Sequence, residues 1–357
     1  GVWIMAYTTI DDPEAYFQVK LYTGDGSTPS ITLDGDTDMQ PDLVWIKNRD
    51  QTDSNCLFDA VRGATKVIHA DATDTETTDA DTLTSFDSDG FALGADVKVN
   101  TDTEAYVAWC WKAGTSFSND ASATSIGTVD STGSASATAG FSIVSFDLTG
   151  ESGNETIKHG LSTAPKVVIT KRRSGGAGDW TSYFGAIGNT YLVLQRTLAG
   201  QTTTDFMNNT APTTSVFTVG DPSWWATDPF IAYCFSEVQG FSKFGSYTGN
   251  GNADGAFIYT GFRPAYLLLK DYTSANNYNW VILDNKRDPS NGIDRRLQAS
   301  GNVAEYTDVS NLCDFVSNGF KWTTSNANWN ASGTGYIYMA FAEAPFVNSN
   351  GVPCNAR

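Results

Sequence analysis

The amino-acid sequence predicts an all-β protein, built as a tandem array of three related jelly-roll or lectin-like β-sandwich repeats. Four landmarks recur three times in the same order: an aromatic strand, a Pro-led apolar strand, a Gly-Phe-type turn and an aromatic closing strand. The composition agrees, because aromatic residues make up 13% of the chain and favour strands over helices. A period of about 100 residues exceeds that of solenoid repeats but suits small all-β domains in tandem.

The Pro-led strands are the most regular landmarks. Each reaches a lysine six positions after its proline, in the segments Pro41–Lys47, Pro165–Lys171 and Pro264–Lys270. These short apolar runs predict strands that are buried on both faces or that lie at the centre of a sandwich. Proline suits the start of such a strand because it has no N–H group to offer a partner strand. At the other end, we expect each lysine to place its ammonium group in solvent.

The closing strands carry aromatic residues on both faces, as expected of a strand at a domain interface. They occupy Tyr106–Trp111, Phe230–Phe235 and Tyr336–Phe341. We expect the final aromatic residues of these segments, Trp111, Phe235 and Phe341, to be equivalent and buried.

The landmarks divide the chain into five segments. These are the first repeat (1–113), a linker (114–140), the second repeat (141–240), the third repeat (241–345) and a C-terminal tail (346–357). Composition predicts the linker, since 21 of its 27 residues are Ser, Thr, Ala or Gly. Within it, Ile126 and Val129 could form a short edge strand. No spacer separates the second and third repeats, so we expect these two to pack as a unit and the first to be more independent.

The chain is acidic, with 40 Asp and Glu residues against 22 Lys and Arg and a net charge of −18. Such a surface repels phosphate groups, so we expect no nucleic-acid partner. No stretch approaches the roughly 20 apolar residues of a membrane-spanning helix, so we also expect no membrane insertion.

Five cysteines are scattered along the chain. Cys110 and Cys234 occupy the same place in the first and second repeats, and Ala340 takes this place in the third. A position that accepts Cys or Ala is small and buried, so we expect free thiols instead of disulfide bonds. The first residues lack the basic segment of a secretory signal, and we therefore expect synthesis in a reducing cytoplasm.

Four tryptophans in polar loops are the candidate binding residues: Trp224, Trp225, Trp322 and Trp329. Exposed aromatic rings flanked by amide side chains could stack on sugar rings, or they could fill a contact with a neighbouring chain. We favour packing or subunit contact.

Catalytic and metal motifs are scarce. The chain has two histidines, no Gly-x-Ser-x-Gly elbow and no histidine pair at zinc spacing, so we expect no catalytic residues, no cofactor and no metal site. The segment 34–38 opens like a calcium loop, but Met39 and Trp45 stand where Gly and Glu are required, which favours a solvated turn. An Asp-x-x-Arg pattern recurs at Asp59 and Asp284, and this recurrence favours an ion pair inside each repeat.

Several long segments resemble a family of structural proteins of marine bacteriophages. The similarity extends over most of the chain and is carried by Tyr16-Phe-Gln-Val-Lys-Leu-Tyr-Thr-Gly-Asp-Gly, Met39-Gln-Pro-Asp-Leu-Val-Trp-Ile-Lys-Asn-Arg, Leu83-Thr-Ser-Phe-Asp-Ser-Asp-Gly-Phe, Trp280-Val-Ile-Leu-Asp-Asn-Lys-Arg-Asp and Tyr338-Met-Ala-Phe-Ala-Glu-Ala-Pro-Phe. The resemblance implies a virion component built of lectin-like β-sandwich repeats, with no catalytic residues to transfer.

These observations together predict a non-enzymatic component of a phage virion surface, either a capsid decoration or a fibre protein. We expect it to act by assembly with other virion proteins and to form a homo-oligomer. One alternative is a tail adhesin that binds host-surface glycans through the loop tryptophans. A further alternative is a glycan depolymerase, because β-sandwich folds can host that chemistry.

Overall fold

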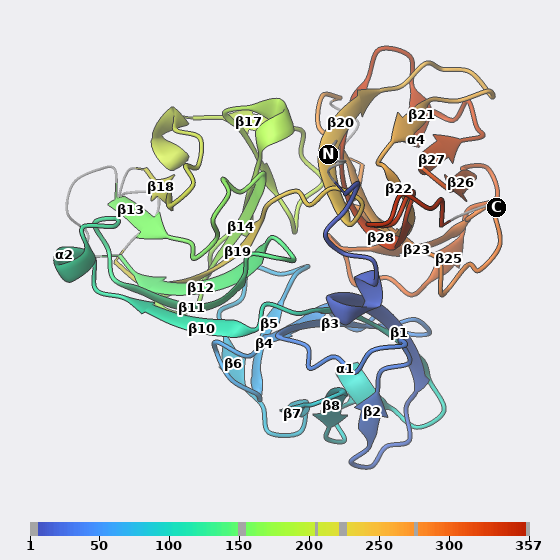
Figure 1. The fold of residues 1–357 in the computed structure, drawn as a ribbon. Coiled ribbons are helices and arrows are strands. Elements are labelled where there is room, and N and C mark those ends of the chain that lie inside the picture. Colours follow the sequence, from blue (N-terminus) through green and yellow to red (C-terminus); the bar gives the residue numbers. More distant parts are fainter. Residues whose placement is uncertain (1–5, 149–154, 204–205, 221–226, 275–277, 355–357) are drawn as a thin grey trace.

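Three lobes of antiparallel β-sheet surround a common centre in the computed structural model, which describes residues 6–148, 155–203, 206–220, 227–274 and 278–354 (Figure 1). Strands account for 44% of the structure and helices for 6%, so the predicted all-β class is confirmed. Each lobe contains one larger and one smaller sheet, consistent with a β-sandwich unit. We call the lobes the first, second and third units, in chain order.

The first unit contains nine strands and two short helices. They are η1 (Pro13–Ala15), β1 (Phe17–Thr23), β2 (Ser30–Thr32), β3 (Leu43–Asn48), β4 (Cys56–Asp59), β5 (Lys66–His69), β6 (Thr77–Thr78), β7 (Leu83–Asp87), β8 (Gly90–Leu93), α1 (Val97–Asn100) and β9 (Ala105–Trp111). Its larger sheet has the order β1-β9-β3-β4-β5-β6, and its smaller sheet has the order β2-β8-β7.

The third unit has the same pattern of strand pairing. Its elements are β20 (Ser242–Thr248), β21 (Phe257–Tyr259), β22 (Phe262–Asp271), β23 (Val281–Asp284), β24 (Arg295–Gln298), β25 (Tyr306–Thr307), β26 (Cys313–Val316), β27 (Gly319–Trp322), α4 (Ala327–Asn330) and β28 (Gly335–Pro345). The larger sheet has the order β20-β28-β22-β23-β24-β25, and the smaller sheet has the order β21-β27-β26.

The second unit keeps this order and extends it. Its elements are β10 (Thr115–Asn119), α2 (Ala121–Thr124), β11 (Ser131–Ser136), β12 (Phe141–Asp147), β13 (Glu155–Lys158), β14 (Val167–Arg172), β15 (Thr181–Phe184), η2 (Gly185–Ile187), β16 (Thr190–Val193), β17 (Gln201–Thr202), η3 (Met207–Asn209), β18 (Val216–Val219) and β19 (Pro229–Phe235). The larger sheet runs β10-β11-β12-β19-β14-β15-β16-β17, and β13 pairs with β18.

The predicted linker at 114–140 is therefore wrong, because it contains two strands of the larger sheet. β11 pairs with β12 along its whole length, and β10 pairs with the other edge of β11. A strand rich in Ser, Thr and Gly has the same composition as a linker, so composition alone cannot distinguish them. Here it is the pairing with β12 that identifies a strand. Of the two residues proposed for a short edge strand, Val129 makes a single bridge with Ile157.

The Pro-led segments form buried strands, as predicted. All residues of β3 and β22 are buried, and so are the first five of β14. Pro264 lies inside β22, where the pairing with β28 shifts register; proline tolerates such an irregular position. The lysines differ from the prediction, since Lys47, Lys171 and Lys270 are all buried.

The closing strands β9, β19 and β28 each contact two hydrophobic cores. In β9, for example, Cys110 packs in the core of its own unit, while Trp109 and Trp111 point the other way. Side chains alternate between the faces of a strand, so one strand serves both cores. The expected burial of Trp111, Phe235 and Phe341 is confirmed. All five cysteines are free thiols, and four of them are buried.

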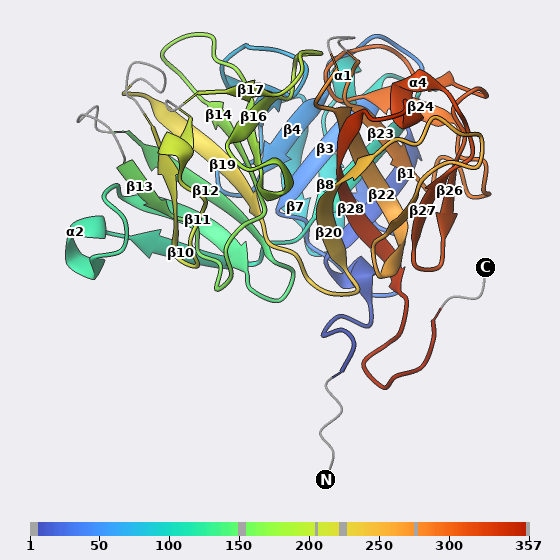
Figure 2. The same cartoon turned by 90° about the horizontal axis from the view of Figure 1, so that it is seen from above.

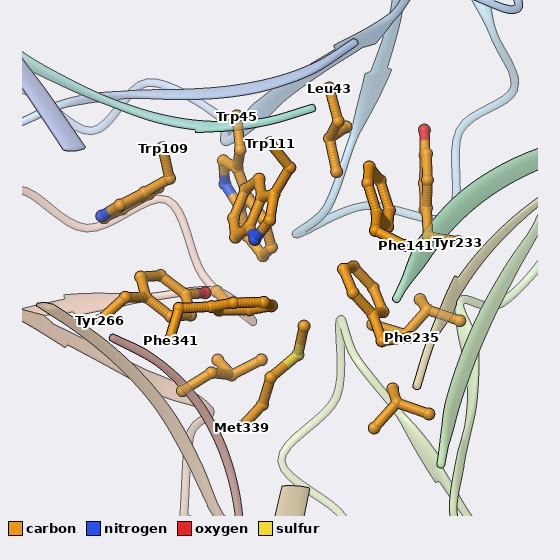
Figure 3. Packing of buried hydrophobic residues seen from close by; sticks show 14 of the residues in the cluster. Leu43, Trp45, Trp109, Trp111, Phe141, Tyr233, Phe235, Tyr266, Met339 and Phe341 are labelled. Atoms are coloured by element: carbon orange, nitrogen blue, oxygen red, sulfur yellow. The ribbon is translucent and has the colours of Figure 1, made fainter. Parts of the chain in front are cut away.

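A single hydrophobic cluster at the centre contains residues of all three units. Figure 3 shows Trp111 and Phe341 facing each other, with Phe235 directed toward the same space. The ring centroids of Trp111 and Phe341 lie 5.7 Å apart, and those of Phe235 and Phe341 lie 5.9 Å apart. The expectation that the first unit is more independent than the other two is therefore wrong.

Both terminal segments leave the molecule from the same face (Figure 2). They also contact each other, since the backbone N–H of Ser349 donates a hydrogen bond to Asp11 over 2.7 Å. None of the described helices is long and apolar enough to cross a membrane.

Candidate functional site

The boundary between the first and second units contains a buried ion pair with a partner from the neighbouring unit. Arg62 Nε donates to Asp59 Oδ2 over 2.5 Å, which confirms the predicted ion pair inside the first unit. The Tyr233 hydroxyl of the second unit donates to the same oxygen over 2.7 Å. Asp59, Arg62 and Tyr233 are all buried, so this contact joins two units in the interior of the protein. Burial and the nearby Asp59 charge raise the pKa of Tyr233.

The boundary between the first and third units repeats this arrangement. Arg287 Nε donates to Asp284 Oδ2 over 2.6 Å, and the Trp109 indole N–H donates to the same oxygen over 3.0 Å. Trp109 and Tyr233 hold matching places on β9 and β19, since they pair with Trp45 on β3 and Ile169 on β14. Each therefore reaches from its own closing strand into the Asp–Arg pair of the neighbouring unit.

A glutamate extends each of these ion pairs toward the surface. Glu76 accepts hydrogen bonds from Arg173 Nε of the second unit over 2.9 Å and from Arg62 Nη1 over 3.4 Å. Burial opposes ionisation, but the hydrogen bond from Arg173 and the charge of Arg62 lower the pKa of Glu76. Glu76 is thus held as an anion between Arg62 of the first unit and Arg173 of the second.

Glu305 has the matching position at the other boundary. It accepts hydrogen bonds from Arg49 Nη2 over 2.8 Å and from Arg287 Nη1 over 3.1 Å, so it too bridges two units. Its pKa is lowered because the hydrogen bond from Arg49 and the charge of Arg287 outweigh burial.

The boundary between the second and third units is apolar at the same positions. Phe184 pairs with Val167 where the first unit pairs Asp59 with Leu43. Met339 takes the place of Trp109 and Tyr233. Both residues belong to the central hydrophobic cluster. Apolar residues therefore replace both the hydrogen-bond donor and the acceptor at this boundary. No polar partner of such a pair is left buried on its own at these two positions.

Two of the three buried lysines form hydrogen bonds across unit boundaries. Lys171 Nζ donates to Gly178 O over 2.6 Å and to Ala72 O of the first unit over 3.4 Å. Lys270 Nζ donates to Tyr278 O over 2.5 Å and to Thr197 O of the second unit over 2.6 Å. Burial lowers the pKa of each of these lysines to about 8. Each of these two ammonium groups thus binds one backbone carbonyl of its own unit and one of the neighbouring unit.

Lys47 is the matching residue of the first unit, but its carbonyl partners are its own neighbours. Its ammonium group donates to Asn48 O over 2.6 Å and to Gln51 O over 3.0 Å, and burial again lowers its pKa to about 8. Here Asn55 makes the contact with the third unit, since its amide donates to Gln298 O and Gly301 O over 3.0 Å each.

Two of the four tryptophans predicted as binding residues are described by the structure, and both are buried. Trp322 and Trp329 are buried in the core of the third unit, where the Arg296 guanidinium lies 5.8 Å from each ring centroid. Neither ring is available to a ligand, because tertiary packing covers what the polar flanking sequence suggested was exposed. Trp224 and Trp225 lie outside the described residues.

His159 and the aspartate-rich segment 34–38 make contacts typical of a structural role. His159 is buried, and its Nε2 lies 3.1 Å from Thr213 O; burial lowers its pKa to about 4. Asp34 forms an ion pair with Lys20 over 3.4 Å, in keeping with a solvated turn. Within the described part of the chain, no three His, Cys, Asp or Glu side chains are grouped so that they could hold a metal ion.

A surface cleft of about 610 Å³ lies beside the strands that extend the second unit. Its walls carry hydroxyl and carboxylate groups, including Ser118, Thr132 and Asp147. Asp120 and Asp130 also line it, but Asp130 accepts a hydrogen bond from Ala121 N, and Asp120 caps α2. The cleft could hold a polar ligand, and the sequence offered no signal for it because its strands looked like a linker.

Comparison with known proteins gives one match. A family model described as a domain of unknown function (DUF7483) matches residues 12–345. No curated protein and no solved structure matches the chain significantly.

Proposed function

The chain belongs to the family described as a domain of unknown function (DUF7483), and we propose that it is a non-enzymatic component of a phage virion surface. In this role it decorates a capsid or forms part of a fibre, and it acts by assembly and surface contact. It is made in the cytoplasm of the host and carried on the particle. The similarity to structural proteins of marine bacteriophages, noted from the sequence, supports the virion assignment.

We further propose that the three units are related repeats of one lectin-like sandwich. The larger sheets of the first and third units have the same strand order, and the second unit contains that order within its longer sheet. Leu43 pairs with Trp111 as Val167 does with Phe235 and Tyr266 with Phe341. Backbone N–H groups of Glu76, Gly200 and Glu305 donate to carbonyls of the neighbouring unit at all three boundaries.

The observation that carries the structural role is the single core shared by all units. Ion pairs at two boundaries and apolar contacts at the third hold the units in one fixed arrangement. A chain that closes its three units in this way is a rigid building block, and rigid blocks suit particles that must survive outside a cell. Other virion proteins and further copies of the chain itself, in a homo-oligomer, are its proposed partners.

The glycan-binding adhesin is the second candidate function, and one observation favours it. The polar cleft lies beside β10 and β11, where the second unit is extended, and insertions of this kind commonly carry binding sites. Buried Trp322 and Trp329 do not contribute to such a site. A glycan depolymerase is the weaker alternative, since no described group of carboxylates supports it over plain binding.

The experiment is peptide mass spectrometry on gradient-purified particles of a phage that encodes the chain, combined with antibody labelling of intact particles. The proposal expects peptides of this chain in the particle fraction and labelling of its outer surface. Purified protein should release no reducing sugar from host envelope polysaccharide. Absence of the chain from particles, or sugar release abolished by one carboxylate substitution, would contradict the proposal.

A further inference from the structure

Two neighbouring side chains on β21 are the most exposed aromatic residues among those that the structure describes. Phe257 is 48% exposed and Tyr259 is 53% exposed; among the described aromatic residues only Tyr306, at 37%, is comparable. Both belong to β21, an edge strand of the smaller sheet of the third unit, and Ile258 between them is buried. Alternation along the strand places the two rings on the same outer face, about 6.6 Å apart along its axis.

The fold itself does not require these two aromatic residues. The matching strand of the first unit, β2, has Ser30 and Thr32 at the exposed positions and Ile31 at the buried one. The register is the same, since Ile31 pairs with Phe91 and Ile258 pairs with Phe320. Removing a large apolar ring from water favours folding, whereas leaving it exposed does not. The stability of the sheet therefore does not explain why these two exposed positions carry aromatic residues.

A hollow of about 380 Å³ adjoins the Tyr259 ring and is lined mainly by polar groups. The hydroxyls of Tyr259 and Tyr7 lie 3.1 Å apart, and Tyr7 donates to Gly261 O over 2.8 Å, which fixes one wall. Lys243 and Glu237 form an ion pair over 3.1 Å on another side. Gln239 lines the hollow with an exposed side chain. Hydrogen-bond donors and acceptors thus lie directly beside the aromatic face.

We propose that Phe257, Tyr259 and the adjoining hollow form a saccharide-binding site. A sugar ring presents C–H groups on its face and hydroxyl groups at its edge. The two aromatic rings accept the apolar face, and Gln239 and the Lys243–Glu237 pair bind the hydroxyls. A volume of about 380 Å³ falls within the range of small-molecule sites, so one or two sugar residues of a longer glycan can occupy it. The net charge of −18 disfavours a nucleic acid as the ligand.

This site is separate from the cleft of the second unit, and it does not depend on where the chain sits in a particle. The test is binding of the full chain to an array of purified bacterial capsular polysaccharides and O-antigens, with affinities then measured by titration calorimetry. The key variant combines Phe257→Ser and Tyr259→Thr, which installs the residues of β2 in β21. The corresponding sheet of the first unit already folds with these residues, so the variant should melt within about 2 °C of the unchanged protein.

The matched control is Tyr306→Thr, which removes the other exposed aromatic ring and installs the residue of β6. We expect the unchanged protein and this control to bind the same glycans, and the double variant to bind at least about tenfold more weakly. Gln239→Ala should also weaken binding, through the hollow. The proposal is overturned if no polysaccharide binds, or if the double variant retains full affinity. It is also overturned if the double variant changes only the sedimentation coefficient, because β21 would then be a contact between copies.

Discussion

The Tyr233 hydroxyl donates a 2.7 Å hydrogen bond to Asp59, 174 positions earlier in the chain. Trp109 and Asp284, 175 positions apart, form the matching contact at another boundary. At the third boundary the corresponding residues are Met339 and Phe184, which are both apolar. A polar, hydrogen-bonded pair thus occupies this position at two boundaries, and an apolar pair occupies it at the third. Each kind of pair can be tested by transferring it to another boundary.

The first prediction concerns Asp59. Replacing Asp59 by Ala leaves Arg62 buried without its main anionic partner, so we expect a loss of about 3–5 kcal/mol in the free energy of unfolding. The combined substitutions Asp59→Phe, Arg62→Ile and Tyr233→Met replace these polar residues with apolar ones, as at the boundary between the second and third units. Since this variant leaves no buried charge at that position, we expect it to cost less than Asp59→Ala alone. Urea unfolding of both variants measures the difference, and a triple variant less stable than Asp59→Ala would contradict the explanation.

The second prediction concerns the shared core. Trp111, Phe235 and Phe341 come from three units but contact one cluster, so replacing any one of them by Ala should cost about 3–5 kcal/mol. The control Tyr306→Ala removes an exposed ring and should change stability by about 0.5 kcal/mol or less. Calorimetric scans should show one cooperative transition in each protein, because the units share a core. A Phe341→Ala variant in which only the third unit melts early would show that the units are energetically separate.

The third prediction is a pH dependence that arises from the buried lysines. The folded pKa of Lys171 is about 8, below the usual value of about 10.4. Between these values the unfolded chain binds more protons than the folded one, so stability should rise with pH from about 8 toward 10. Above about 10 it should fall again, because buried tyrosines such as Tyr233 have raised pKa values.

The variant Lys171→Met tests the contribution of this lysine. It should flatten the rise in stability between about pH 8 and 10, and it should cost about 1–3 kcal/mol at neutral pH because Gly178 O and Ala72 O lose their donor. Lys166→Met, at an exposed lysine of the same unit, is the control and should leave the pH profile unchanged. Denaturation midpoints across this pH range provide the measurement, and an identical slope in Lys171→Met would show that the lysine is not the source.

The fourth prediction concerns a strained turn before β9. Thr103 has a φ of 67°, a conformation unfavourable for a β-branched residue, and the matching residue of the third unit is Gly333, with a φ of 80°. Their backbone N–H groups donate to Gly24 O and Gly249 O respectively. Thr103→Gly should therefore stabilise the chain by about 1 kcal/mol, whereas Thr132→Gly in β11 should destabilise it by about 0.5–1 kcal/mol. A loss of stability in Thr103→Gly, measured by thermal melting, would exclude strain at this turn.

The repeated landmarks allowed much of the fold to be predicted from the sequence. The Pro-led strands, the buried closing aromatics and the Asp–Arg pairs all recur, and recurrence identifies them without knowledge of the fold. The same comparison could have shown that the two aromatic residues of β21 replace Ser30 and Thr32. Burial of Trp322 and Trp329 could not be judged in this way, because it depends on which chain segments cover them.

Other features depend on contacts between distant segments. The buried lysines bind carbonyls of loops that the sequence does not place beside them, such as Thr197 O for Lys270. The strands β10 and β11 lack the apolar alternation that reveals a strand, since pairing with β12 is what orders them. The cross-unit bond of Tyr233 requires the arrangement of the units, which no local pattern encodes.

A cryo-electron microscopy map of particles from a phage that encodes this chain tests the central claim most directly. The claim is that the chain is a rigid structural component of the virion surface, closed around one shared core. It predicts three-lobed density on the outside of the particle that fits the whole molecule as one body. Particles without such density, or density in which the three units are separated from one another, would contradict it.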